Sequence, residues 1–467
     1  MKNHRGIFVI IFIIISLVIS GAELKAAPDE YSIRIYCDQP MEKIKHQLGG
    51  IALGGSAHSY LKPEIKKTIK RLGFPLVRLE AVPGSYPELF NPQNEKYNWK
   101  RLDAEIEAIQ ETGAEIVLNI FYMPRWLSAE PHIQHGLFSP PRDYKIWWKL
   151  IFDIVKHVNA EKKFGIKYWE IWNEPSGRFF FRAWDKGKIN EFWKLYEITA
   201  GAIKSADSTA LVGGFADNPT YPVNFQSFFR YCKLNNVPID FVSLHWYAFW
   251  EKEGYENPEL YFHFANSISK LYKKYFGKRP ELIWSEWNHL VDCPRPDLEK
   301  QASYMGSALY WMQESVAEKA MFFRIEPYVK RGESSLETVL NEDNKIQVSG
   351  RILKMFLMLP DQRINVSTFP PNTTILAATG KNRLVIMITR RDFASDKDIR
   401  LNLEVLALSP EDRNFMVEKY VEDRNSSDTK GFRKPMVLKN QKIEQGRARV
   451  SVLLKNHSVV LLNLKSY

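Results

Sequence analysis

Apolar segments of strand length alternate with longer amphipathic segments between about residues 47 and 358. This alternation is typical of repeated strand–helix units. Eight of the apolar segments have the length and pattern of strands, and they lie near 48–55, 75–81, 115–122, 167–174, 211–216, 240–247, 281–288 and 320–327. Eight parallel strands that are each followed by a helix predict an α/β fold of the (β/α)8, or TIM barrel, type rather than an open sheet.

Beyond about residue 360 the pattern changes to alternating strands without helices, separated by Asn, Asp, Gly and Pro. This pattern predicts an accessory C-terminal β-sandwich. The segment 31–37 also has the composition of a strand, and it would add to the edge of that sandwich. The expected division is an N-terminal strand segment over 23–46, a catalytic barrel over 47–358 and a sandwich over 359–467.

The first 22 residues have the features of a secretory signal peptide. Lys2 and Arg5 precede an apolar run over 7–19, and small residues follow at 20–22. The run is short for a membrane helix, so we expect cleavage near Ala22, with an uncleaved anchor as the alternative. No later segment is apolar over the roughly 18 residues that a membrane span needs. The mature protein is therefore expected to be secreted or periplasmic, without a stable membrane span.

Charge and cysteine content narrow the classes of partner and cofactor. The net charge of +11 would favour acidic polymers through long-range attraction, or it reflects only solvated lysines. No arginine-rich run or nucleic-acid motif occurs, so no nucleic-acid partner is expected. The three cysteines form no CxxC pair, and the glycine-rich segment 48–55 lacks a dinucleotide fingerprint. We expect neither a cofactor nor a metal, and a homo-oligomer stays open.

The carboxyl-terminal ends of barrel strands carry the functional groups in folds of this kind. In this chain the polar residues at or near those positions are Arg78, Asn119, Asn173, Glu174, His245, Tyr247, Glu286, Arg324 and Glu326. Glu174 and Glu286 belong to strands four and seven, which are three strand–helix units apart and nearly opposite each other in an eightfold barrel. Two facing carboxyl groups suit glycosidic bond cleavage, in which one protonates the leaving oxygen and the other acts on the oxocarbenium-like centre.

Four motifs resemble glycoside hydrolase family 39, a family of clan A barrels. They are KYWEIWNEP, LIWSEWN, PPRDYKIWWKL and VPIDFVSLHWY, and the resemblance covers roughly residues 45–467. It implies a β-xylosidase-like or α-L-iduronidase-like retaining enzyme that acts on an oligo- or polysaccharide. In that case Glu174 is the general acid/base, whose pKa the site must raise, and Glu286 is the nucleophile.

The same resemblance gives the neighbouring residues their expected roles. Asn173 would hold the sugar 2-hydroxyl or the surroundings of the nucleophile. Tyr247 or His245 would donate a hydrogen bond to Glu286, and Arg78 would match the arginine of strand two. Such donors would keep Glu286 ionised.

Two strands depart from the better-known xylosidases of the family. Strand two reads VRLEA where a His is expected after the Arg, and strand eight reads FFRIEP where a Trp usually forms a sugar platform. Arg324 or Arg125 would then contact an anionic sugar, or would only pair with Glu326 or Glu80. The sequence favours the structural pairing.

Several candidate residues also have a purely structural interpretation. Trp126 and Trp287 would stack on sugar rings or pack in the core, and Asn119 is a further candidate for contact with substrate. His245 has no HxxH or HExxH neighbour, so a metal-ligand role is not expected. Glu170 is interpreted as a buried, hydrogen-bonded residue. Three other functions remain open at this stage: an endo-acting polysaccharide hydrolase, a uronide-specific glycosidase and a carbohydrate-binding pseudoenzyme.

Overall fold

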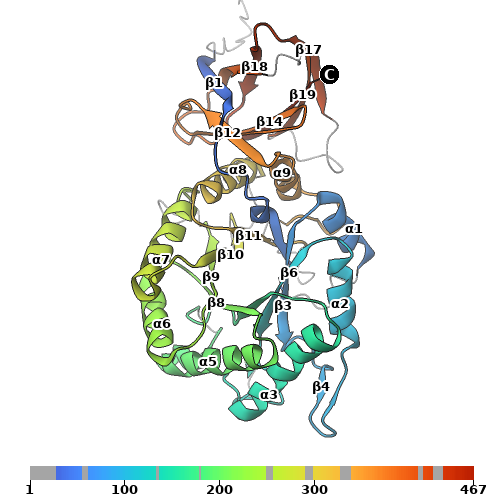
Figure 1. The fold of residues 1–467 in the computed structure, drawn as a ribbon, viewed down its shortest axis with the longest axis vertical. Helices are drawn as coiled ribbons and strands as arrows, with labels where there is room; N and C mark the ends of the chain where they lie inside the picture. The colour runs from blue at the N-terminus through green and yellow to red at the C-terminus, as the bar shows by residue number, and fades with distance from the viewer. Residues whose placement is uncertain are drawn as a thin grey trace, which may run out of the picture.

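A computed structural model describes residues 28–54, 62–132, 136–177, 180–248, 256–289, 298–326, 338–408, 414–423 and 435–466. The predicted signal peptide lies outside these residues. The described chain forms a closed barrel with a separate sheet docked at one side (Figure 1).

Eight parallel strands close the barrel in the order β10-β11-β2-β3-β6-β7-β8-β9. Their bounds are β2 Gly50–Ala52, β3 Leu76–Pro83, β6 Glu115–Phe121, β7 Tyr168–Ile171, β8 Leu211–Asp217, β9 Phe241–Tyr247, β10 Glu281–Asn288 and β11 Lys319–Phe323. The main helices around them are α1 Pro63–Leu72, α2 Lys100–Gln110, α3 Tyr144–Val155, α5 Ile189–Ala206, α6 Pro222–Asn235, α7 Leu260–Phe276, α8 Leu298–Glu314 and α9 Val348–Leu357. The predicted (β/α)8 fold is confirmed.

The barrel strands are buried on both faces, which explains their nearly continuous apolar sequences. Inward-facing residues such as Leu76, Phe241 and Ile283 form a small cluster inside the barrel. Outward-facing residues such as Trp284 and Trp287 join the larger cluster between strands and helices. A short hairpin of β4 Phe90–Asn91 and β5 Lys96–Tyr97, and the short helix α4 Arg182–Asp185, lie in the connections.

The accessory domain is a continuous nine-stranded sheet in the order β17-β16-β19-β14-β13-β12-β1-β15-β18. Its strands are β1 Asp29–Pro40, β12 Gln362–Val366, β13 Thr373–Gly380, β14 Arg383–Arg390, β15 Ile399–Leu406, β16 Asn414–Glu422, β17 Met436–Lys442, β18 Ala448–Leu454 and β19 Ser458–Ser466. One face of these strands encloses a single apolar core. The N-terminal strand β1 pairs with β12 on one side and β15 on the other, so it lies inside the sheet rather than at its edge.

The outer face of this sheet packs against the barrel. Met387 and Val459 belong to the same apolar cluster as the barrel helices, and a Cβ at Gly306 of α8 would meet Thr389. A buried ion pair joins Arg351 of α9 to Glu422 of β16. The two parts therefore share a packed interface along α8 and α9.

Strand irregularities occur close to the rim that carries the polar residues. The pairing of β10 with β9 shifts register between Trp284 and Glu286, so Ser285 is an extra residue in β10. Backbone φ is positive at Trp172 and Glu174 after β7, and at Ala216 in β8. Bulges and unusual backbone conformations redirect side chains, and they are common at functional sites.

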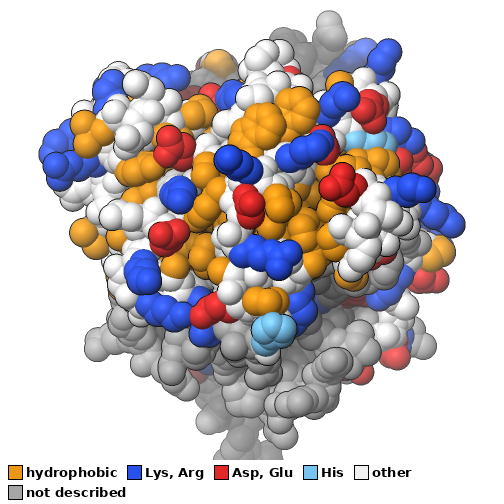
Figure 2. Space-filling model, turned by 90° about the horizontal axis from the view of Figure 1, so that it is seen from below, with side chains coloured by type: hydrophobic (Ala, Val, Ile, Leu, Met, Phe, Trp, Pro, Cys, Tyr) orange, Lys and Arg blue, Asp and Glu red, His pale blue; other side chains and the backbone are white. Residues whose placement is uncertain are grey.

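Figure 2 shows one face of the molecule, on which basic side chains are interspersed with acidic ones and separated by apolar patches. Within the part of the chain that the structure describes, no helix is long and apolar enough to cross a membrane.

Candidate active site

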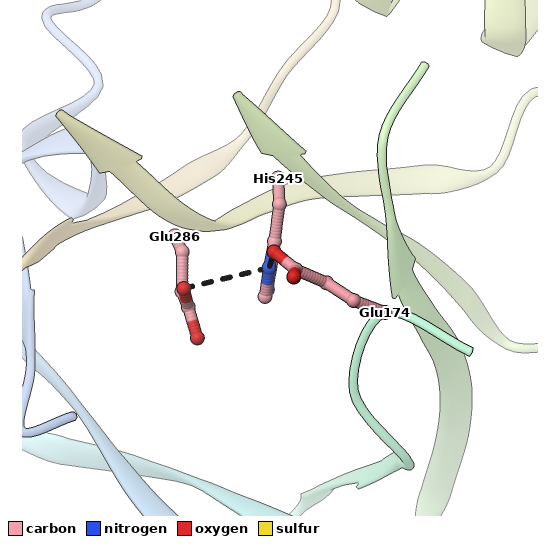
Figure 3. Close-up of side chains that lie close together, drawn as sticks. All are labelled: Glu174, His245 and Glu286. Atoms are coloured by element: carbon pink, nitrogen blue, oxygen red, sulfur yellow. Dashed lines mark hydrogen bonds and ion pairs between the residues drawn. The ribbon is translucent and has the colours of Figure 1, made fainter. Parts of the chain in front are cut away.

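The site lies where β7, β9 and β10 end at one rim of the barrel. A carboxylate oxygen of Glu174, another of Glu286 and a ring nitrogen of His245 lie within 4.8 Å of one another. Figure 3 shows the two carboxylates beside the His245 ring, Glu286 from β10 and Glu174 from the segment that follows β7. Because β7 and β10 are three strands apart in the closed order, the two carboxyl groups face each other across the barrel.

Arg78 of β3 connects most of the charged groups below these carboxylates. Its side chain is fully buried, and it donates to Glu286 Oε1 at 2.5 Å, to Glu80 Oε1 at 2.5 Å and to Glu170 Oε2 at 2.6 Å. A further bond at 2.9 Å reaches Asn173 Oδ1. Burial alone would lower the pKa of Arg78, but the three carboxylates raise it above its ordinary value. Arg78 therefore stays charged and fixes the positions of its partners.

Glu170 and Asn119 form the floor of the site. Glu170 is fully buried, as expected, and its Oε2 accepts hydrogen bonds from Arg78 and from Asn119 Nδ2. Burial would raise the pKa of Glu170, but Arg78 lowers it below the ordinary value. Asn119 also donates to the backbone oxygen of Trp172 and accepts from the amide of Ala81. The side-chain amide of Asn119 is thus hydrogen-bonded to residues of the barrel on both its oxygen and its nitrogen. These bonds favour a positioning role over the predicted contact with substrate.

Glu286 is surrounded by hydrogen-bond donors. Arg78 donates to its Oε1, the Tyr247 hydroxyl donates to its Oε2, and His245 Nδ1 lies 3.5 Å from Oε2. Burial nevertheless raises the pKa of Glu286 to about 7, while His245 and Arg78 lower it. The sequence predicted the donors, but it did not reveal that desolvation would outweigh them.

Glu174 is the more accessible carboxyl group, with 24% of its side chain exposed. Its Oε1 lies 2.7 Å from His245 Nδ1, and its backbone amide donates to the oxygen of Ala216. Burial raises the pKa of Glu174 to about 7, although Arg78 lowers it. Burial also lowers the pKa of His245 to about 4, so the ring is neutral at neutral pH.

The three groups of Figure 3 also match the ligand types of a metal site. Ligands about 2.0–2.2 Å from a tetrahedral cation lie more than about 3 Å apart. His245 Nδ1 and Glu174 Oε1 are 2.7 Å apart, which is a hydrogen-bond distance. Glu286 Oε1 is already bonded to the Arg78 cation. The arrangement fits a hydrogen-bonded carboxylate pair, and we propose no metal centre.

Strand eight contributes a structural brace. Arg324 is fully buried and donates to the backbone oxygens of Glu326 and Gly54. Glu326 forms an ion pair with Lys62 at 2.8 Å, and Glu80 accepts from the amide of Gly54. Arg324 therefore joins the ends of β11 and β2 through backbone oxygens. Arg125 donates to the backbone oxygen of Pro131.

The two tryptophans proposed as sugar platforms have other contacts. Trp287 is fully buried on the outer face of β10, where it packs against Tyr261 and Phe322. Residues alternate across a strand, so Glu286 points into the barrel and Trp287 points out of it. The predicted sugar contact of Trp287 is therefore wrong. The ring of Trp126 packs against Phe90 of the β4–β5 hairpin.

A (β/α)8 barrel with two carboxyl groups this close at the ends of strands four and seven has the architecture of a glycosidase. The family model of glycosyl hydrolases family 39 matches residues 63–289, which include both carboxyl groups. This match agrees with the family that the motifs indicate.

Relatives and solved structures extend the similarity beyond the matched region. A β-xylosidase of Caldicellulosiruptor saccharolyticus is 23% identical over 436 residues, which cover 82% of this chain and 83% of the relative. The GH39 enzyme from Xanthomonas axonopodis pv. citri has a TM-score of 0.78 at 16% identity, over 97% of this chain and 100% of that chain. A glucosidase from Croceicoccus marinus has a TM-score of 0.75 at 18% identity, over 95% and 100% of the two chains. At these identities the two structures support the fold alone.

Sequence reasoning did not single out Ser285 or Asp217. Ser285 Oγ lies 3.1 Å from His245 Nε2. Asp217, at the end of β8, is buried and accepts from Ser176, and burial raises its pKa to about 7. A polar residue in an otherwise apolar strand was the available signal in both cases. Asp217 lies outside the four motifs, and Ser285 lies within LIWSEWN, in which only Glu286 and Trp287 were given expected roles.

We predict that Arg78→Met shifts the acidic limb of the kcat/KM profile to higher pH. Loss of the cation removes an interaction that lowers the pKa of Glu286, so this carboxyl ionises only at higher pH. A neighbouring cation lowers the pKa of a carboxyl group by about one to three pH units. Arg101→Met is the matched control, because Arg101 is also largely buried and pairs with Glu105 away from the site. An acidic limb that stays at its wild-type position in Arg78→Met would contradict the assigned electrostatics.

Proposed function

We propose that the protein is a retaining glycosidase in which Glu174 is the general acid/base and Glu286 is the nucleophile. The observation that carries this proposal is the separation of the two carboxyl groups, whose nearest oxygens lie within 4.8 Å. Retaining enzymes hold these groups about 5–5.5 Å apart, whereas inverting enzymes need about 6.5–9.5 Å to admit a water molecule. The spacing therefore supports double displacement.

In the first step Glu286 attacks the anomeric carbon while Glu174 protonates the glycosidic oxygen. A bond forms between the carboxylate oxygen and the anomeric carbon, and the bond to the leaving oxygen breaks. Two neighbouring carboxyl groups with a pKa of about 7 hold one proton between them near neutral pH. Arg78 and Tyr247 donate to Glu286 and favour its charged form, so the proton belongs on Glu174.

In the second step water cleaves the glycosyl ester. Glu286 is neutral as an ester, so it no longer repels a negative charge on Glu174, and the pKa of Glu174 falls. Glu174 then removes a proton from the attacking water, which bonds to the anomeric carbon. The Glu286 carboxylate leaves, and the product retains its anomeric configuration.

The supporting residues hold the nucleophile and the sugar. Arg78 and Tyr247 position Glu286 through separate oxygens. The Asn173 oxygen accepts from Arg78, which orients the amide and directs its NH2 group toward a substrate hydroxyl. His245 contacts Glu174 and takes no part as a cation, because burial lowers its pKa to about 4.

We propose a neutral glycoside as the substrate. Around Arg78 the described site holds the carboxyl groups of Glu80, Glu170, Glu174 and Glu286. Even with Glu174 protonated, three carboxylates face one guanidinium, and such a site repels a uronic acid. Arg324 is engaged with backbone oxygens at the barrel seam. The name of the similar protein from Caldicellulosiruptor saccharolyticus, a β-xylosidase, also favours a neutral sugar. The predicted signal peptide supports a substrate outside the cytoplasm.

Glu286→Ala is expected to abolish turnover, because no other group forms the glycosyl ester. Glu174→Gln is expected to slow substrates with poor leaving groups by at least about two orders of magnitude, since general acid catalysis contributes about 10²–10⁴-fold. Activated aryl glycosides should be affected less in Glu174→Gln. Added azide should restore turnover of Glu286→Ala by forming a glycosyl azide.

Glu191→Gln is a matched control, because Glu191 lies on the outer helix α5, where it contacts Tyr144 of α3. Wild-type rates in Glu286→Ala would remove the nucleophile assignment. They would also favour a carbohydrate-binding protein without catalytic activity, because the presence of both carboxyl groups is the main argument against that function.

Neutral aryl β-xylosides and β-glucosides should be hydrolysed with higher kcat/KM than the matching aryl uronides. The expected ratio is at least tenfold, because the carboxylates of the site repel the substrate carboxylate. Initial rates at neutral pH with the same aryl leaving group measure the ratio directly. A higher kcat/KM for the uronide would overturn the choice of sugar class and leave the mechanism intact.

A further inference from the structure

Asp217 is a buried carboxyl group that the double-displacement steps do not use. It ends β8 and is only 1% exposed, so a bound sugar does not contact it. Its Oδ1 accepts hydrogen bonds from the Ser176 hydroxyl at 2.8 Å and from the Asn218 amide at 2.9 Å. Its Oδ2 has no hydrogen-bond partner among the described residues. A buried polar group of this kind needs a specific explanation.

Ser176 belongs to the turn that carries Glu174. β7 ends at Ile171, and its pairing with β8 ends where Ile171 lies beside Gly214. Glu174 lies beyond this last pair, and the amide of Gly177 donates to its backbone oxygen at 2.8 Å, which closes a turn over 174–177. The paired strands alone therefore do not fix the direction of the Glu174 side chain.

The backbone of Glu174 adopts a conformation that needs support from its surroundings. Its φ is 43°, in the left-handed region, where a side chain crowds the backbone. Such a conformation persists only where neighbouring structure holds it. The end of β8 provides two contacts: Ala216 accepts from the Glu174 amide at 3.0 Å, and Asp217 accepts from Ser176. The first contact holds the turn before the Glu174 side chain, and the second holds it after.

We propose that Asp217 is a positioning residue that, through Ser176, holds the carboxyl group of Glu174 where it can protonate the leaving oxygen. The inference rests on the proposed role of Glu174 as the acid/base. A general acid must lie within hydrogen-bond reach of the atom that it protonates. Glu286 is held separately, by Arg78 and Tyr247 from β3 and β9. Loss of the Asp217 contact therefore impairs the acid and leaves the nucleophile in place.

The contact between Ser176 and Asp217 does not require a charge on Asp217. Burial raises the pKa of Asp217 to about 7, although Ser176 and Asn218 lower it. A hydroxyl donates equally to an oxygen of a carboxylate, a carboxylic acid or an amide. Asparagine at position 217 keeps the accepting oxygen and the side-chain shape, whereas alanine removes both. The two substitutions thus separate the hydrogen bond from the charge.

The test compares two leaving groups on the same glycon, chosen as one that the wild-type enzyme hydrolyses. Asp217→Ala should lower kcat/KM for an alkyl glycoside at least about tenfold, because a misplacement of about 1 Å can cost about a hundredfold. For the dinitrophenyl glycoside it should change kcat/KM less than about twofold, since this leaving group needs no acid. Ser176→Ala should reproduce this selective loss, and Asp217→Asn should keep both wild-type values.

Two further variants show whether the two residues act through one contact. In the double variant Ser176→Ala/Asp217→Ala the loss should be no larger than in Asp217→Ala, because residues that share one interaction are not additive. Ser139→Ala is the matched control, since it removes another hydrogen bond from serine to a carboxylate, at 2.7 Å to Glu130, outside the Glu174 turn. Its ratio of kcat/KM between the two leaving groups should stay at the wild-type value.

Equal losses for both leaving groups in Asp217→Ala and Ser176→Ala would overturn the proposal, because they indicate only a general structural role. A loss in Asp217→Asn as large as in Asp217→Ala, or additive losses in the double variant, would overturn it too. Ser176 is partly exposed, so Ser176→Ala decides the matter if Asp217→Ala does not fold. Wild-type rates for the alkyl glycoside in Glu174→Gln would refute the proposed function itself. If Glu174→Gln is selectively impaired and the alanine variants are not, only the role of Asp217 fails.

Discussion

The site depends on one buried cation. Arg78 is fully buried and contacts Glu80, Glu170 and Glu286, and each of these carboxylates would be costly to bury alone. The guanidinium is planar and offers several donors in fixed directions, so it sets positions as well as charge. Through Glu286 it holds the proposed nucleophile, and through Glu170 it is linked to Asn119 of the neighbouring strand. Without this cation the carboxylates would take up protons or separate.

The barrel supplies the geometry that Arg78 then stabilises. Parallel strands present alternate residues to the interior, which brings Arg78 and Glu80 of β3 to one face. The bulge at Ser285 adds a residue to β10 and aligns Glu286 with His245. The positive φ at Glu174 turns its carboxyl group toward the same histidine. Together with His245 of β9, these two carboxyl groups lie within 4.8 Å of one another.

The sequence predicted the barrel because strand and helix periodicities are local, and the eight predicted strands agree closely with the observed ones. It also indicated Glu174 and Glu286, since each follows or ends an apolar strand within a recognisable motif. The outward direction of Trp287 depends on its register relative to Glu286, and a motif alone does not reveal it. The raised pKa of Glu286 depends on desolvation, and the role of Asn119 depends on backbone groups brought in from other strands. These properties arise only from packing.

The central claim is that Glu286 forms a covalent bond with the sugar during turnover. The most direct measurement uses a 2-deoxy-2-fluoro glycoside with an activated leaving group, built on a glycon that the wild-type enzyme hydrolyses. The fluorine slows both steps, and the good leaving group lets the glycosyl-enzyme accumulate. Proteolysis and mass spectrometry should then locate one added glycosyl group on the peptide that contains Glu286. A label on Glu174 or Glu80, or inactivation without any attached sugar, would contradict the account.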